Sequence, residues 1–190
     1  MKIYSITPDV NHYQSFQYDY PDTDPFWRSD RWTFDCTPKA SGWVPPKVYI
    51  LSPNLKRGNF FNLSPGGLVI DAEGINALRA LLEMSGELLP VSYKGEEFAF
   101  LNVTSFVDAL DQDRTNWVYA KGSGTKIRIE KYAFHSHRLP ETPLFRIPET
   151  NKTVTFTIEG LKDPEDEFKF NVEQKGLKGL IFKEIWTDDK

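Results

Sequence analysis

A run that is apolar on both faces of a strand most constrains how this chain can fold. Residues 87–93 read ELLPVSY, a Lys-Gly turn follows, and residues 96–107 read EEFAFLNVTSFV. Two such runs joined by a short turn predict a β-hairpin. The second run is apolar at successive positions, so both faces of its strand need cover. We therefore predict a central strand with Leu101 and Val103 buried.

Two segments carry the signals of short helices. Asp71 is placed to cap the first, and Gly86 is expected to end it. The second is expected to open at Pro164 and to stop at Gly176. The residues predicted to face inward are Ile75, Leu78, Leu82, Phe168 and Val172.

Further segments show the alternation of strands, and they lie at residues 14–20, 125–134, 143–147, 153–158 and 179–186. In the second of these, Ile127 and Ile129 are expected to face the core while the charged residues between them face solvent. The prediction is a single α+β domain, mostly antiparallel sheet with two helices. Its aromatic, proline-rich residues 1–49 are expected to pack on a main domain of residues 50–190.

Length and composition indicate a globular protein: 190 residues can bury a sizeable core, and 39% are hydrophobic. The net charge of -4 argues against non-specific nucleic-acid binding. Cys36 is the only cysteine, which fits a reducing compartment, and no histidine lies near it in sequence to activate it. No segment has the pattern of a signal peptide or a membrane span. We expect a cytoplasmic protein without nucleic-acid or membrane partners.

The segment YDYPDTDPFWRSDRWTF, at residues 18–34, sets aromatic and acidic side chains side by side. Burying carboxylates without partners is costly, so most of the acids must face solvent. Tyrosine, tryptophan and phenylalanine are also the residues that dominate binding interfaces. Two interpretations stay open: a solvated loop over an aromatic core, or a face that binds a basic partner. The residues of that candidate face are Asp19, Asp22, Asp24, Trp27 and Asp30.

His135 and His137 form the one pattern that suggests a metal. On a strand, residues two apart share a face, so both imidazoles would be able to meet one ion. Further ligands would be needed, and no spacing in the sequence points to them. We favour a polar strand end beside Arg138.

The other candidate motifs have simpler interpretations. Acid–base or calcium chemistry would need carboxylates in an arrangement that the sequence does not indicate for Asp108, Asp111 and Asp113. We expect these three residues to cap a turn. KGSGT, at residues 121–125, lacks the spacing of a phosphate-binding loop and is expected to join two strands. Arg146 is expected to be solvated or structurally paired.

Three segments together resemble a known family: ELLPVSYKGEEFAFLNVTSFVDALDQDRT, PLFRIPE and GLKGLIFKEIW. In order and spacing they are similar to an immunity-protein family of bacterial polymorphic toxin systems, of the myxobacterial type and formerly a domain of unknown function. The resemblance covers residues 50–186. The segment TFTIEGLKDPEDEFKFNVEQ, at residues 155–174, departs from the family pattern because it is longer and more acidic. The resemblance implies a cytoplasmic inhibitor that binds a toxin domain, with no catalytic residues and no cofactor.

We therefore expect a non-catalytic immunity protein that binds and neutralises a cognate toxin protein. A basic nuclease toxin would suit an acidic, substrate-like face. The alternative is a small enzyme or metal-binding protein that uses His135, His137 and a carboxylate.

Overall fold

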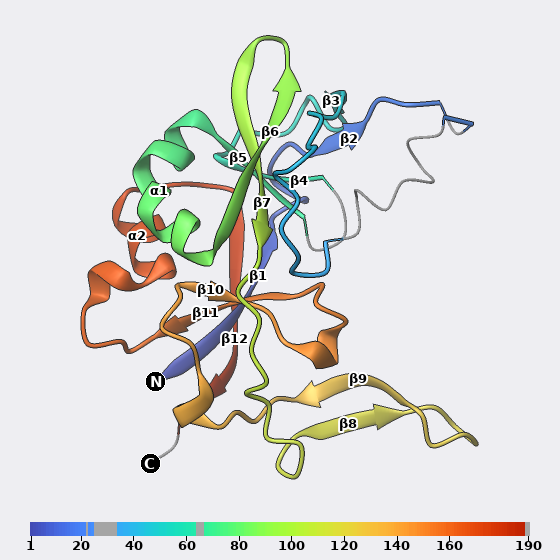
Figure 1. The fold of residues 1–190 in the computed structure, drawn as a ribbon, viewed down its shortest axis with the longest axis vertical. Helices are drawn as coiled ribbons and strands as arrows, with labels where there is room; N and C mark the ends of the chain where they lie inside the picture. The colour runs from blue at the N-terminus through green and yellow to red at the C-terminus, as the bar shows by residue number, and fades with distance from the viewer. Residues whose placement is uncertain (22, 25–33, 64–66, 189–190) are drawn as a thin grey trace.

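The computed structural model describes residues 1–21, 23–24, 34–63 and 67–188 (Figure 1). The strands are β1 (Lys2–Pro8), β2 (Phe16–Tyr18), β3 (Val48–Ile50), β4 (Phe60–Asn62), β5 (Leu68–Asp71), β6 (Gly86–Tyr93), β7 (Glu96–Val103), β8 (Asn116–Tyr119), β9 (Lys126–Lys131), β10 (Leu144–Phe145), β11 (Thr155–Glu159) and β12 (Leu180–Thr187). The helices are α1 (Ala72–Ser85) and α2 (Phe168–Gln174), with 3-10 turns at Ser136–Arg138, Pro148–Thr150 and Pro164–Asp166. The predicted class, α+β with mostly antiparallel strands and two helices, is confirmed.

β7 is an interior strand, as its sequence predicted. It lies in an antiparallel sheet ordered β4-β5-β7-β6. Leu101 and Val103 point into the core beneath α1, whereas Phe98 and Phe100 pack on the opposite face with Phe16 of β2. Leu101 is only 1% exposed, so the prediction that both faces of this strand are covered is confirmed.

α1 is capped as predicted, since the Asp71 carboxylate accepts a hydrogen bond of 2.8 Å from the backbone N–H of Gly74. The chain then passes from α1 directly into β6 at Gly86. A Cβ atom at Gly86 would lie 2.0 Å from the carbonyl oxygen of Asn102, so glycine is required by the close approach of β6 to β7. The β6–β7 turn is Lys94-Gly95, as predicted, with both residues in the left-handed region that suits a tight hairpin.

A second antiparallel sheet has the order β10-β11-β1-β12. β1 pairs with β11 on one side and β12 on the other, so the N-terminal segment supplies an interior strand to the body. Ile3 packs on one face of this sheet with Phe145 and Phe156. Ile6 packs in the core beneath α1, together with Phe168 of α2.

β9 corrects one prediction. β8 and β9 form a two-stranded ribbon that projects from the lower end of the body (Figure 1). Ile127 is 61% exposed, and only Ile129 packs partly against the core. The expected half-buried strand is therefore wrong: no third described strand pairs with this ribbon to bury its apolar face. We call residues 114–131 the arm.

The second helix starts later than expected. Pro164 opens a separate 3-10 turn, and α2 begins at Phe168, which is buried with Val172 as predicted. Between the two, Glu167 is buried and its carboxylate accepts hydrogen bonds from the backbone N–H groups of Gly160 (2.7 Å) and Leu161 (2.9 Å). Part of the acidic stretch at residues 163–167 is thus internal to the fold. Within the described ranges, no helix is long and apolar enough to cross a bilayer.

Candidate protein-interaction site

The predicted acidic face falls partly within the described residues. Asp22, Trp27 and Asp30 lie outside them. Asp19 is exposed directly after β2, and its backbone N–H bonds to the carbonyl of Lys47. Asp24 is half-buried in a turn. The structure therefore places two of the five predicted residues, and the other three fall outside the described ranges.

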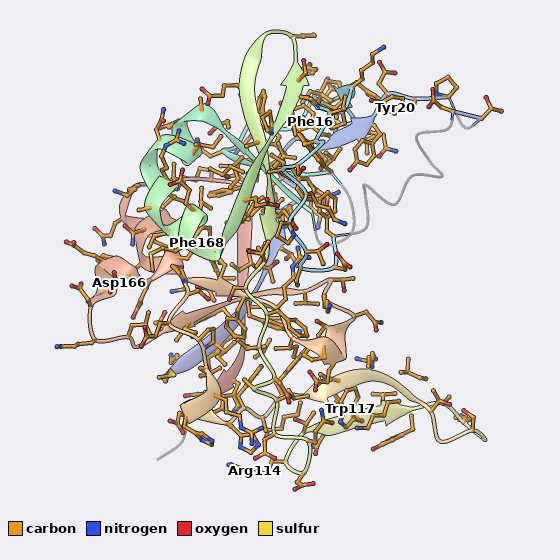
Figure 2. The ribbon with its side chains drawn as sticks, in the orientation of Figure 1. Phe16, Tyr20, Arg114, Trp117, Asp166 and Phe168 are labelled. Carbon is orange, nitrogen blue, oxygen red and sulfur yellow. The ribbon has the colours of Figure 1, made fainter. Side chains whose placement is uncertain are left out.

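The aromatic residues that precede these acids are core, in agreement with the predicted alternation. Phe16 lies with its ring centroid 5.0 Å from that of Phe61 and 5.1 Å from that of Phe98 (Figure 2). Tyr18 is buried beside them, and Tyr20 is half-buried and accepts a hydrogen bond from the backbone N–H of Lys47. Aromatic packing of this kind stabilises the sheet and leaves Asp19 at its rim.

The far end of the same segment is held by Arg146, which is 1% exposed. Its Nη1 atom donates to the carbonyl oxygens of Phe34 (3.0 Å) and Lys152 (2.8 Å). The role predicted as solvated or structurally paired is thus structural. Burial lowers the pKa of the Arg146 guanidinium from its ordinary value. Next to Phe34, burial raises the pKa of the Cys36 thiol, which favours the unreactive protonated form.

His135 and His137 do not share a strand. The 3-10 turn at Ser136–Arg138 carries His137, and His135 immediately precedes it, so the expected strand placement is wrong. The two ring centroids are 5.6 Å apart, and the Nδ1 atom of His135 lies 3.7 Å from an oxygen of Asp111. In the part of the chain that the structure describes, no cluster of three or more metal-ligating side chains forms.

Asp111 caps a turn, as predicted. Its carboxylate accepts hydrogen bonds from the backbone N–H groups of Asp113 (3.2 Å) and Arg114 (3.1 Å). The turn leads directly into β8. Asp113 enters this cap only through its backbone N–H, and Asp111 supplies the carboxylate.

Backbone hydrogen bonds fix the base of the arm to the body. The N–H of Asp111 donates to the carbonyl of Ala133, and the N–H of His135 donates to the carbonyl of Ala109, each at 2.9 Å. Trp117 of β8 lies opposite Ile129 of β9, and both pack against the core. The arm is therefore anchored at its base while its outer half extends into solvent (Figure 1).

The outer half of the arm combines apolar and cationic side chains. Tyr119 is 52% exposed, and Ile127 is also solvent-accessible. Lys126 holds its ammonium 4.2 Å from the ring centroid of Trp117 and donates to Gln112 at 3.0 Å. KGSGT forms the turn at the tip, as predicted, with Gly122 and Gly124 in the left-handed region.

Positive charge predominates along the arm. Residues 114–131 carry one acid, Glu130, against five cations: Arg114, Lys121, Lys126, Arg128 and Lys131. None of these cations forms an ion pair with another described residue. Figure 2 shows Arg114 at the base of the arm and Trp117 along β8.

Sequence reasoning missed the arm as a projecting two-stranded ribbon. Its basic composition was visible, but alternation of apolar and charged residues is common to a half-buried sheet strand and a free ribbon. What distinguishes them is a third strand to cover the apolar face, and neighbouring strands in a sheet need not be neighbours in sequence.

In comparisons with known proteins, no family model matches this chain. No curated protein matches it either. The resemblance to immunity proteins therefore rests only on the three sequence segments quoted above.

Proposed function

We propose that this chain is an immunity protein, which binds a toxin domain and neutralises it without catalysis. The sequence resemblance supplies the biological role. The arm is the observation that carries the binding part of the proposal.

Large apolar side chains in water favour association, because a partner that covers them removes that surface from solvent. Tyr119 and Ile127 occupy such positions on an anchored ribbon. Tyrosine and arginine are enriched in protein interfaces, and Arg128 lies on the same ribbon. The arm thus has the composition of a protein-binding element.

The charge of the arm selects its partner. Cations without ion pairs among the described residues attract an acidic surface and speed its approach. The arm lies far along the molecule from β2, where Asp19 is exposed (Figure 1). We propose an acidic patch of the toxin as the partner of the arm. Asp19 and Asp24, with the predicted residues outside the described ranges, remain a separate candidate for basic surfaces.

Growth rescue tests this function. The chain is co-expressed with the toxin encoded beside its gene, and bacterial growth is compared for the parent and for Lys121→Gln/Arg128→Gln and Tyr119→Ser/Ile127→Thr variants. The matched control is Lys162→Gln/Lys175→Gln, which removes two exposed cations away from the arm.

We expect both arm variants to fold normally, to weaken the complex by about tenfold or more, as truncation of central interface residues does, and to lose protection. The control should protect fully. Arm variants that bind and protect as well as the parent would disprove the proposal. The proposal would also fail if the arm bound an oligonucleotide and the arm variants left binding of the toxin unchanged.

A further inference from the structure

β12 is a free edge of its sheet. It pairs with β1 on one side, and no described strand is hydrogen-bonded to its other side. The strand is eight residues long, without proline, and Ile181 is 43% exposed. Free edges of this length present a row of unpaired backbone groups that another strand can use.

The ladder with β1 shows which backbone groups face outward. Asp9 N–H donates to the carbonyl of Gly179, and Asp188 N–H donates to the carbonyl of Met1. Hydrogen-bonded and non-hydrogen-bonded pairs alternate along an antiparallel ladder. The bond at Gly179 fixes this alternation for the first half of β12, and the bond at Asp188 fixes it beyond the irregularity opposite Ile3 and Tyr4. The N–H and C=O groups that point away from β1 therefore include those of Phe182, Glu184 and Thr187.

A polar cavity of about 530 Å³ lies where this edge meets the base of the arm. The C-terminal half of β12 forms one wall and carries Glu184, which is paired with Lys2 at 3.2 Å, and Asp188 lies at its end. Arg114 and Lys131 contribute positive charge from the other wall. Tyr132 and Trp186 add aromatic surface to the lining. An extended segment that follows β12 toward its C-terminal end would run into this cavity.

We propose that β12 accepts an extended, acidic segment of a partner protein as a fifth strand of the sheet. Backbone hydrogen bonds to Phe182 and Glu184 hold the segment in register, and a carboxylate at its end meets Arg114 and Lys131. In strand addition of this kind, main-chain bonds supply affinity and side-chain contacts supply specificity. The inference rests on the proposed function for the identity of the partner, the toxin.

A second copy of this chain fits the edge less well. Antiparallel self-pairings centred on the middle of β12 set Lys183 opposite Lys183, or Glu184 opposite Glu184, whereas one centred on Phe182 joins only residues 180–184 of the strand. Like charges directly opposite each other destabilise a strand pair. A different protein with an acidic segment avoids this repulsion.

The test needs no toxin. Two acetylated peptides, TVTVTVEE and TVTVTVKK, are titrated into the isotopically labelled protein, and backbone amide shifts are followed by NMR. We expect the acidic peptide to shift the amides of residues 180–188 and 131–133 and to bind more tightly than the basic one. Lys131→Gln should reduce that preference by roughly two- to fivefold, the size of an exposed charge pair.

Two variants at one position isolate the backbone contribution. Glu184→Pro removes an outward N–H, which an edge strand tolerates, and should abolish binding. Glu184→Gln keeps the N–H and removes a carboxylate from the cavity lining, so it should bind the acidic peptide at least as tightly as the parent does. Should the proline variant unfold, hydrogen exchange of the parent decides instead, because strand addition must slow exchange at Phe182 and Glu184.

Shifts confined to the arm, equal affinity for both peptides, or unchanged exchange at those amides would each overturn strand addition. If strand addition fails these tests but the growth-rescue results are as expected, the arm remains the toxin-binding element. If the peptide binds β12 as expected but the arm variants still protect, strand addition is supported and the arm is not the toxin-binding element.

Discussion

Arg146 donates a 3.0 Å hydrogen bond to the carbonyl oxygen of Phe34, a residue 112 positions away in the chain. The same guanidinium binds the carbonyl of Lys152, whose ammonium in turn donates to the carbonyl of Asp35 at 3.0 Å. The ring of Phe34 stacks on Phe100 with centroids 4.0 Å apart. The end of the acidic and aromatic segment is thereby tied to both sheets.

Replacing Arg146 should therefore destabilise the fold. Arg146→Met keeps the length of the side chain but leaves the partly buried carbonyl groups of Phe34 and Lys152 without this donor. We expect the free energy of unfolding to fall by about 3 kcal/mol, measured by denaturant titration. Arg128→Met on the exposed arm is the control and should change stability by less than about 0.5 kcal/mol. Equal effects of the two changes would mean that the Arg146 contacts contribute little.

Leu101→Ala tests the centre of the first sheet. The side chain is buried between β7 and α1, so its truncation leaves a cavity and should cost about 2–5 kcal/mol. Leu51→Ala is the control, since Leu51 is 54% exposed. The thermal midpoint of each variant reports the difference, and an unchanged midpoint for Leu101→Ala would contradict the packing described for β7.

The Glu159–Lys169 pair should make stability depend on pH. The Lys169 ammonium donates to the Glu159 carboxylate at 2.9 Å, and this hydrogen bond is the main cause that holds the pKa of Glu159 below its ordinary value of 4.5. Because the pKa is lower in the folded state, the stabilisation is present above the unfolded pKa and is lost as pH falls through the folded one.

Glu159→Gln should accordingly lower the free energy of unfolding at pH 7 and have a smaller effect near pH 3. Denaturant titrations at both values measure the difference, and Lys169→Met should show the same trend. If the loss of stability were equal at pH 7 and pH 3, the ion pair would not be the source of that loss.

The histidines should be dispensable for protection. His137 is exposed, and the nearest carboxylate of His135 belongs to Asp111, which already caps a turn. We expect His135→Ala/His137→Ala to protect cells as the parent does and purified protein to hold no stoichiometric zinc or manganese. Loss of protection by a folded double variant would return the catalytic or metal-binding alternative.

The acidic candidate face predicts a basic partner surface, whereas the arm predicts an acidic one. Changing Asp19, Asp22, Asp24 and Asp30 to Asn should slow association with a basic toxin surface and flatten its salt dependence, because screening weakens exposed charge pairs near 0.1 M salt. Stopped-flow association at low and moderate salt measures both. If the toxin meets the arm instead, the four changes leave the on-rate unchanged or raise it.

Much of the fold was accessible from sequence because the signals are local. An apolar run on both faces identified β7, and a side-chain cap identified the start of α1. Arg146 was not identified as buried, because two of the groups that it binds are backbone carbonyls, which every residue carries. The exposed ribbon and the free edge of β12 depend on which strands pair at long range, and alternation along one strand contains no such information.

β1 pairs only with β11 and β12 among the described strands, so an early segment of the chain finds both neighbours between residues 155 and 187. At synthesis rates of about 5–20 residues per second, β1 is made roughly 7–30 s before β11. The second sheet therefore cannot close during most of synthesis. A newly made copy becomes competent only after its late strands emerge, and contacts this distant in sequence slow folding further. Protection against a toxin translated at the same moment would then depend on copies that have already folded.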